Sequence, residues 1–161
     1  MKRSVYVDAY VIMPFETVRS LMRDTPGALF GMAAENKGPE VLTVAVGAHA
    51  GVIPIHDRFA IEFGSFEEAP GHYFATLHVK FAGDKHHVLV PDVDAKVEAI
   101  DEGYSRTELR LVGSYEPRMG PAGALEDVLL GHHAVEEAMQ QVLYEVRNHL
   151  GSVSRTTGRP K

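Results

Sequence analysis

The sequence contains no cysteine. This absence excludes disulfide bonds, thiolate nucleophiles and zinc sites built on sulfur. The chain also lacks any apolar run that approaches the roughly 18 residues of a membrane-spanning helix. Residues 1–13 place Asp8 where a signal peptide requires an unbroken apolar stretch, so they indicate a first strand. From these absences we expect a cytoplasmic protein without integral membrane association.

Motifs for nucleotide chemistry and for a nucleophilic serine are also missing. The sequence contains neither GxxxxGKS/T nor GxGxxG, and it has no GxSxG elbow. Ser65 and Ser114 each follow a glycine, but their flanking residues continue strands and offer no sharp turn. The net charge of −6 disfavours a protein that coats nucleic-acid phosphates. No nucleic-acid partner is therefore expected.

Nine histidines raise the question of a metal site. His132 and Glu136 have the spacing that places two side chains on one face of a helix, and adjacent histidines occur at 86–87 and 132–133. A metal site needs three or four converging ligands, and the sequence has no His-Glu-x-x-His arrangement or acidic cage. We therefore expect neither a metal ion nor another cofactor.

The length of 161 residues suits one domain with a substantial core. Residues 151–161 carry three cations, no acidic side chain and no apolar periodicity. The sequence therefore predicts a single domain over residues 1–150, followed by a disordered basic tail over residues 151–161.

The alternation of apolar and polar residues predicts the strands of this domain. They cover residues 4–12, 41–48, 53–66, 73–81, 93–100 and 104–115. Apolar residues at helical spacing predict two short helices over 15–23 and 28–34, and a long amphipathic helix over 131–150. Strands grouped ahead of one long helix are typical of an α+β domain.

Three stretches carry a resemblance to a known superfamily: the strand–helix junction at 11–18, the strand at 59–64, and the strand end at 107–117 that precedes the final helix. Through them residues 4–150 resemble the helix-grip superfamily abbreviated SRPBCC, which includes START lipid-transfer domains, the birch-pollen allergen and polyketide cyclases. The resemblance implies a curved antiparallel sheet of about six strands wrapped around a long C-terminal helix, with two short helices after the first strand. It also implies an apolar cavity between helix and sheet that holds a small hydrophobic molecule.

Polar residues occupy five positions that the alternation assigns to inward, otherwise apolar faces: Asp57, Tyr73, Thr107, Tyr115 and His132. A buried polar group without a partner costs of order 1–3 kcal/mol, so these side chains could converge in a cavity where a ligand supplies their partners. A structural interpretation is also open, in which Asp57 caps a backbone amide at a strand end. His132 would then be a core histidine bonded to a carbonyl group.

Apolar side chains on the same inward faces complete the predicted ligand site. They come from three of the strands and from the long helix: Phe59, Ile61, Phe63, Leu77, Leu109, Leu111, Val135 and Met139. Phe59, Phe63 and Met139 fit ordinary core packing equally well.

The leading functional hypothesis is the binding of a small hydrophobic or aromatic ligand, such as a lipid or a polyketide-like molecule, between the helix and the sheet. The alternative is an enzyme of the polyketide cyclase, aromatase or dehydrase kind. In that case His132 or Asp57 would act as general base. Tyr73 or Tyr115 would donate a hydrogen bond to an enolate.

A third hypothesis is an interaction domain with a filled core and no ligand. Exposed Tyr6, Tyr10 and Ile12 would then form the edge of a dimer. The expected partners of the chain are therefore a small hydrophobic molecule or a second copy of itself, and the protein would be a monomer or a homodimer.

Overall fold

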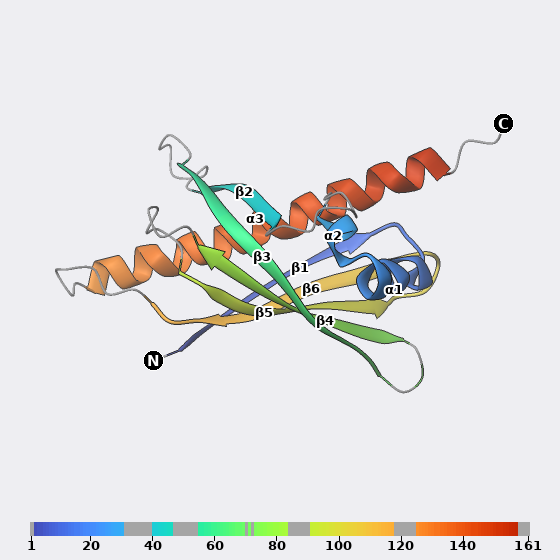
Figure 1. Ribbon diagram of the computed structural model, residues 1–161, viewed down its shortest axis with the longest axis horizontal. Coiled ribbons are helices and arrows are strands. Elements are labelled where there is room, and N and C mark those ends of the chain that lie inside the picture. Colours follow the sequence, from blue (N-terminus) through green and yellow to red (C-terminus); the bar gives the residue numbers. More distant parts are fainter. Residues whose placement is uncertain are drawn as a thin grey trace.

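The computed structural model describes residues 2–30, 40–46, 55–69, 71, 73–83, 91–117 and 125–157, with side chains within 2–30, 60–69, 71, 73–82, 91–117 and 132–152. In these ranges the chain forms six strands and three helices (Figure 1). Their order is β1 (Arg3–Val11), α1 (Phe15–Asp24), α2 (Pro26–Leu29), β2 (Glu40–Val46), β3 (Ile55–Glu68), β4 (Phe74–Gly83), β5 (Val93–Asp101), β6 (Thr107–Tyr115) and α3 (Leu125–Thr157). Each strand begins and ends within three residues of its predicted bounds.

The six strands form one antiparallel sheet in the order β1-β6-β5-β4-β3-β2. β1 and β2 lie at its two edges, and α1 and α2 come between them in the chain. The long helix α3 crosses one face of the sheet and packs chiefly on β1 (Figure 1). The predicted α+β fold, in which a sheet of about six strands grips a C-terminal helix, is confirmed.

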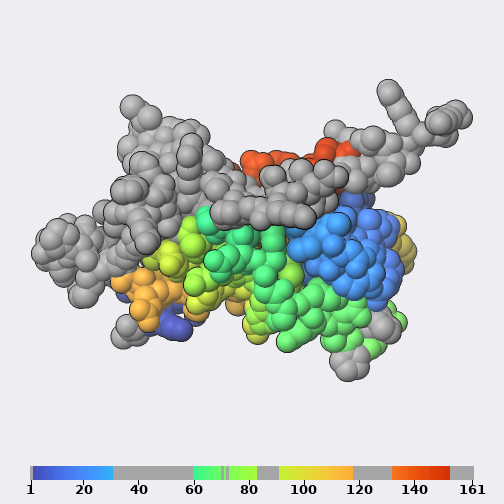
Figure 2. Space-filling view, viewed as in Figure 1, coloured from blue at the N-terminus to red at the C-terminus, as the bar shows by residue number. Residues whose placement is uncertain are grey.

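The turn into α1 follows from Pro14. Its carbonyl oxygen accepts hydrogen bonds from the amides of Thr17 and Val18, at 3.0 and 3.2 Å, which closes the first turn of the helix. Pro26 then begins α2, since its fixed φ suits the first helical position. α2 therefore begins two residues before the predicted start at 28, and residues 31–34 of that prediction lie outside the described residues. Figure 2 shows α1 and α2 (blue) adjoining β3 and β4 (green) below α3.

The core follows the strand alternation of the sequence. In β1, Val5 and Val7 are buried, whereas Tyr6 and Tyr10 point outward and are 53% and 44% exposed. The same cluster takes its other buried side chains from the strands, α1 and α3, among them Phe15, Val18, Met22, Val79, Phe81, Val97, Val142, Leu143 and Val146. A single core thus joins α3, α1 and the inner face of the sheet.

A β-bulge in β3 changes the register between Phe63 and Phe66. Phe63 lies opposite Val79 in β4, and Phe66 lies opposite Leu77. Both partners point inward, so the extra residue keeps both phenylalanines against the core, although their spacing of three would place them on opposite faces of a regular strand. The Phe63 ring contacts Phe30 at 5.7 Å between ring centroids.

The long helix differs from its prediction at both ends, because it begins at Leu125 and continues to Thr157. Residues 151–157 are therefore helical, which corrects the predicted disorder of this segment; residues 158–161 lie outside the described part. Gly151 costs about 1 kcal/mol in a helix, but an established helix adds one hydrogen bond for each further residue. The Ser152 hydroxyl also donates to the carbonyl oxygen of His149 at 2.7 Å.

No helix within the described ranges is long and apolar enough to cross a membrane.

Candidate functional site

A polar contact joins the sheet to α3 at one end of the interior. Tyr115 is the last residue of β6 and is 3% exposed, and His132 lies two turns into α3. The Tyr115 hydroxyl oxygen and His132 Nδ1 are 2.6 Å apart, which is a short hydrogen bond. The two rings are nearly parallel, with an interplanar angle of 20°. The fold therefore brings together two of the five polar residues predicted to face inward.

Glu136 extends this contact by one helical turn. Its Oε1 atom lies 3.4 Å from His132 Nε2, and its Oε2 atom lies 3.9 Å from His133 Nδ1. A carboxylate beside Nε2 favours a proton on that nitrogen, so Nδ1 of the neutral ring accepts the hydrogen bond of the Tyr115 hydroxyl. When both ring nitrogens carry protons, Nδ1 donates to the phenol oxygen instead. The arrangement can therefore pass a proton between a half-exposed carboxylate and a buried phenol.

Burial is the main cause that raises the pKa of Tyr115, and the negative charge of Glu136 raises it further. Arg3 opposes this effect and lowers the pKa of the phenol. Tyr115 is therefore a neutral phenol at physiological pH, able to donate a hydrogen bond to a carbonyl oxygen. The charged neighbours act from opposite sides, since Arg3 is the partner of Tyr115 in β1 and Glu136 lies on α3.

The other three predicted polar residues do not join this contact. Thr107 is completely buried, and its hydroxyl donates to the carbonyl oxygen of Met13 at 2.8 Å, so its partner is structural. The predicted inward orientation of Tyr73 is wrong, because it is 70% exposed. It precedes the first residue of β4, in the turn where its carbonyl oxygen accepts from the amide of Asp101. Asp57 pairs with Val44 in the sheet, and its side chain lies outside the described residues.

The apolar residues predicted to line the ligand site are close-packed in this structure. Five of them have side chains that are at most 1% exposed: Leu77, Leu109, Leu111, Val135 and Met139. A side chain beside a space large enough for water keeps some surface that water can touch, so no such space adjoins these five. Ile61 is 4% exposed, and Phe63 is partly buried against the core. The side chain of Phe59 lies outside the described residues.

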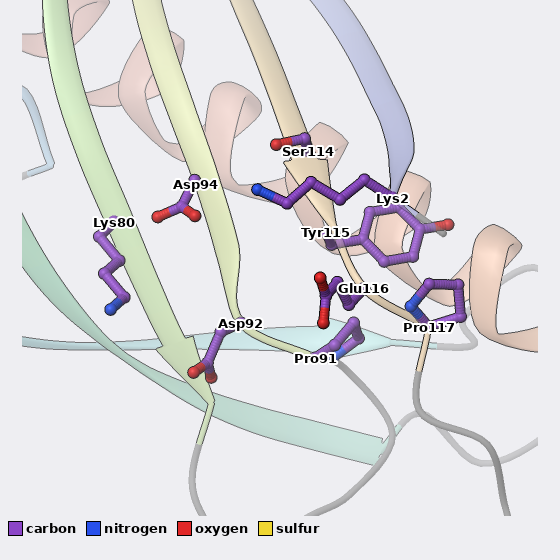
Figure 3. A pocket seen from close by; sticks show the side chains of 9 residues that line it. All are labelled: Lys2, Lys80, Pro91, Asp92, Asp94, Ser114, Tyr115, Glu116 and Pro117. Atoms are coloured by element: carbon purple, nitrogen blue, oxygen red, sulfur yellow. The ribbon is translucent and has the colours of Figure 1, made fainter.

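A shallow hollow lies beside the end of β6, with a volume of about 430 Å³. Figure 3 shows that its lining is polar and of mixed charge, with Lys2 and Lys80 near Asp92, Asp94 and Glu116. Opposite charges of this kind compensate each other and select no ligand charge. Among the side chains that the structure describes, no three metal-ligating residues gather to hold an ion.

Sequence reasoning missed the part that Glu136 takes in the contact. The signal was present, since Glu136 follows His132 at the spacing that places both on one helical face. The same spacing also suits two ligands of a metal ion. The structure instead places the Tyr115 hydroxyl on the other ring nitrogen, and among the described side chains no third metal ligand gathers there.

Comparison with solved structures identifies the fold. The Zhui aromatase/cyclase from Streptomyces sp. R1128 superposes with a TM-score of 0.57 at 17% identity, over 99% of this chain and 100% of that chain. Ara h 8.0201 gives 0.53 at 12% identity, over 94% and 99% of the two chains. Norcoclaurine synthase from Thalictrum flavum, in complex with dopamine and hydroxybenzaldehyde, gives 0.51 at 12% identity, over 100% and 90%. No protein-family model matches the sequence, and no match was found among curated proteins. The chain thus shares the helix-grip fold of these three proteins, as the resemblance implies.

Proposed function

We propose that this protein binds a small hydrophobic or aromatic molecule that carries a carbonyl or hydroxyl group. The proposed site is the end of the helix-grip interior where Tyr115 meets His132. The observation that carries the proposal is the 2.6 Å contact between the Tyr115 hydroxyl and His132 Nδ1, which joins sheet and helix at one end of a largely apolar core. A solved structure with the same fold holds dopamine and hydroxybenzaldehyde, two small aromatic molecules with polar groups, which supports this ligand class. A cytoplasmic setting, and a monomer or homodimer, are part of the proposal.

The polar end of the interior is accessible, because the His132 side chain is 29% exposed. A ligand can therefore displace water from the Tyr115–His132 pair and bind to it without passing through the core. Its apolar body would contact Leu111 and Val135, which are fully buried, so these side chains must separate as it binds. Covering 250 Å² of ligand at roughly 25 cal/mol per Å² contributes about 6 kcal/mol before the costs of association. This corresponds to a Kd no tighter than tens of micromolar, so we expect weak binding.

Fluorescence of 2-naphthol tests this proposal, since the chain contains no tryptophan to interfere. We expect saturable binding of 2-naphthol that is roughly 2- to 10-fold tighter than that of naphthalene, the range expected for one hydrogen bond. The Tyr115→Phe variant should bind both molecules equally. His133→Gln is the matched control, because His133 is the next residue along the helix, is 76% exposed and lies beside Glu136. Equal binding of the two probes by the parent protein would contradict the proposal.

A second candidate is an enzyme of the polyketide cyclase, aromatase or dehydrase kind. The chain of contacts from Glu136 through His132 to Tyr115 favours it, because a carboxylate that orients an imidazole is a recurring arrangement in general acid–base catalysis. His132 would accept a proton from a substrate carbon and become an imidazolium, which Glu136 would stabilise. The Tyr115 hydroxyl would donate its proton to the enolate oxygen so formed, and the imidazolium would then return a proton to the phenolate, which leaves an enol product and neutral His132 and Tyr115. The fold shared with the Zhui aromatase/cyclase is consistent with this candidate.

The test of the second candidate is a chemical product. Incubation of the purified protein with an aromatic polyketide-like substrate should give a cyclised or dehydrated product, observed by mass spectrometry. His132→Gln should abolish the product while the thermal midpoint stays unchanged, and His133→Gln should leave it intact. If the parent protein forms no product but binds 2-naphthol, the enzyme candidate fails and the binding proposal stands.

A further inference from the structure

A separate groove lies at the opposite ends of β6 and α3 from the Tyr115–His132 contact. Its volume is about 800 Å³, and three segments line it. The end of β1 and the following turn contribute Tyr10, Val11 and Ile12, the residue before β6 contributes Arg106, and α3 contributes Arg147, Asn148, Gly151 and Ser152. We call this site the arginine groove.

Two guanidinium groups are held at this groove by tyrosine rings. The Arg106 guanidinium carbon lies 4.1 Å from the centroid of the Tyr10 ring, and that of Arg147 lies 5.7 Å from the centroid of Tyr144. Among the side chains that the structure describes, neither arginine pairs with a carboxylate, whereas Arg23 pairs with Asp24. Two unpaired guanidinium groups in a chain of net charge −6 mark a local site for an anion.

The groove also offers an apolar wall. Ile12 is 83% exposed at its edge, next to the Tyr10 ring. Gly151 leaves the helix side open, because a Cβ atom built there would have no atom within 4 Å beyond its chain neighbours and the adjoining helix backbone. A glycine inside a helix costs about 1 kcal/mol relative to alanine, and here it leaves room for a group to approach the helix backbone.

We propose that the arginine groove binds an aromatic carboxylate, at a site distinct from the proposed function above. The carboxylate receives hydrogen bonds from the Arg147 guanidinium and from the Asn148 side-chain amide. The aromatic ring packs against Ile12 and against the free face of the Arg106 guanidinium, whose other face rests on Tyr10. This arrangement explains why both arginines and an exposed isoleucine gather at one hollow.

An NMR titration of the full chain with 2-naphthoate, followed by the chemical shifts of the backbone amides, tests the inference. We expect saturable shifts at the amides of Ile12 and Gly151, with a Kd of about 1 mM or below. The neutral analogue 2-naphthamide should bind at least tenfold more weakly at the same residues, and acetate, which lacks the ring, should not bind. Shifts at the groove with 2-naphthamide as strong as with 2-naphthoate would overturn the proposal, as would no shifts there with 2-naphthoate.

Variants of the arginine groove test its charge and its shape separately. Arg106→Gln and Arg147→Gln should each weaken 2-naphthoate binding at least fivefold, and Arg23→Gln, outside the groove, should leave it unchanged. Gly151→Leu should abolish binding without lowering the thermal midpoint, since its side chain projects into open space. Unchanged binding by a folded Gly151→Leu protein would refute the site. Because these shifts are read at the groove, their outcome is independent of 2-naphthol binding at Tyr115.

Discussion

Replacing Met139 by tryptophan distinguishes a packed core from a pocket. Met139 lies in the middle of α3 and is completely buried, with no water-sized space beside it. An indole at this position must displace its neighbours, and such overpacking typically costs about 1–3 kcal/mol. If Met139 instead lined the cavity predicted from the sequence, the indole would fill space at a cost of less than about 1 kcal/mol. The structure therefore predicts clear destabilisation of Met139→Trp.

Urea unfolding followed by circular dichroism measures this free energy of unfolding. The thermal midpoint should also fall by roughly 2–4 °C for each kcal/mol lost in a chain of this size. Tyr144→Trp is the matched control, since Tyr144 lies on the same helix, is 42% exposed, and should accept tryptophan within about 0.5 kcal/mol. Equal stability of Met139→Trp and the parent protein would refute the reasoning and restore the cavity.

Three further predictions concern stability. Because the pKa of Tyr115 is raised in the folded state, the stabilisation given by its neutral phenol is fully present below the unfolded pKa of about 10 and is lost as the pH rises through the folded pKa. Urea unfolding from about pH 9 to 11 should therefore show a steeper loss of the free energy of unfolding for the parent protein than for Tyr115→Phe, and equal slopes would contradict this prediction. Gly113→Ala should cost about 1–3 kcal/mol, since its Cβ would lie 2.9 Å from the Val93 side chain. Gly151→Ala should instead stabilise the protein by up to about 1 kcal/mol, because alanine is the better helix former and its Cβ meets open space. A thermal midpoint that is lower for Gly151→Ala than for Gly113→Ala would contradict both assignments. Deletion after Leu150 should leave the thermal midpoint nearly unchanged, and a fall of several degrees would show that residues 151–161 dock on the domain.

Local patterns were sufficient to predict the strands and the α+β class, whereas the helix-grip arrangement was expected from the family resemblance. In β1 the alternation of Val5 and Val7 with Tyr6 fixed which face is buried, because successive strand residues point to opposite faces. The ends of elements were less predictable. Gly151 has a low helix propensity, but the helix continues through it, because propagation of an existing helix outweighs one unfavourable residue.

The candidate site could be predicted only in part. Tyr115 and His132 were both assigned to inward faces, but their hydrogen bond depends on how α3 crosses the end of β6, which no local pattern specifies. Tyr73 keeps the alternation of β4 but falls one residue before the strand, where the chain turns into solvent. The arginine groove escaped prediction because Arg106 and Arg147 lie far apart in the sequence and meet only in the folded chain.

The most direct test of the proposed function is ¹⁵N NMR of the His132 imidazole during a titration with neutral 2-naphthol. The ring nitrogens report the hydrogen bond to Tyr115, and the neighbouring His133 ring serves as an internal control. The proposal predicts a saturable shift of His132 Nδ1 as the ligand hydroxyl joins the Tyr115–His132 pair, with no comparable shift at His133. A His132 signal that stays constant up to the solubility limit of 2-naphthol would contradict the proposal that this end of the interior is a ligand site.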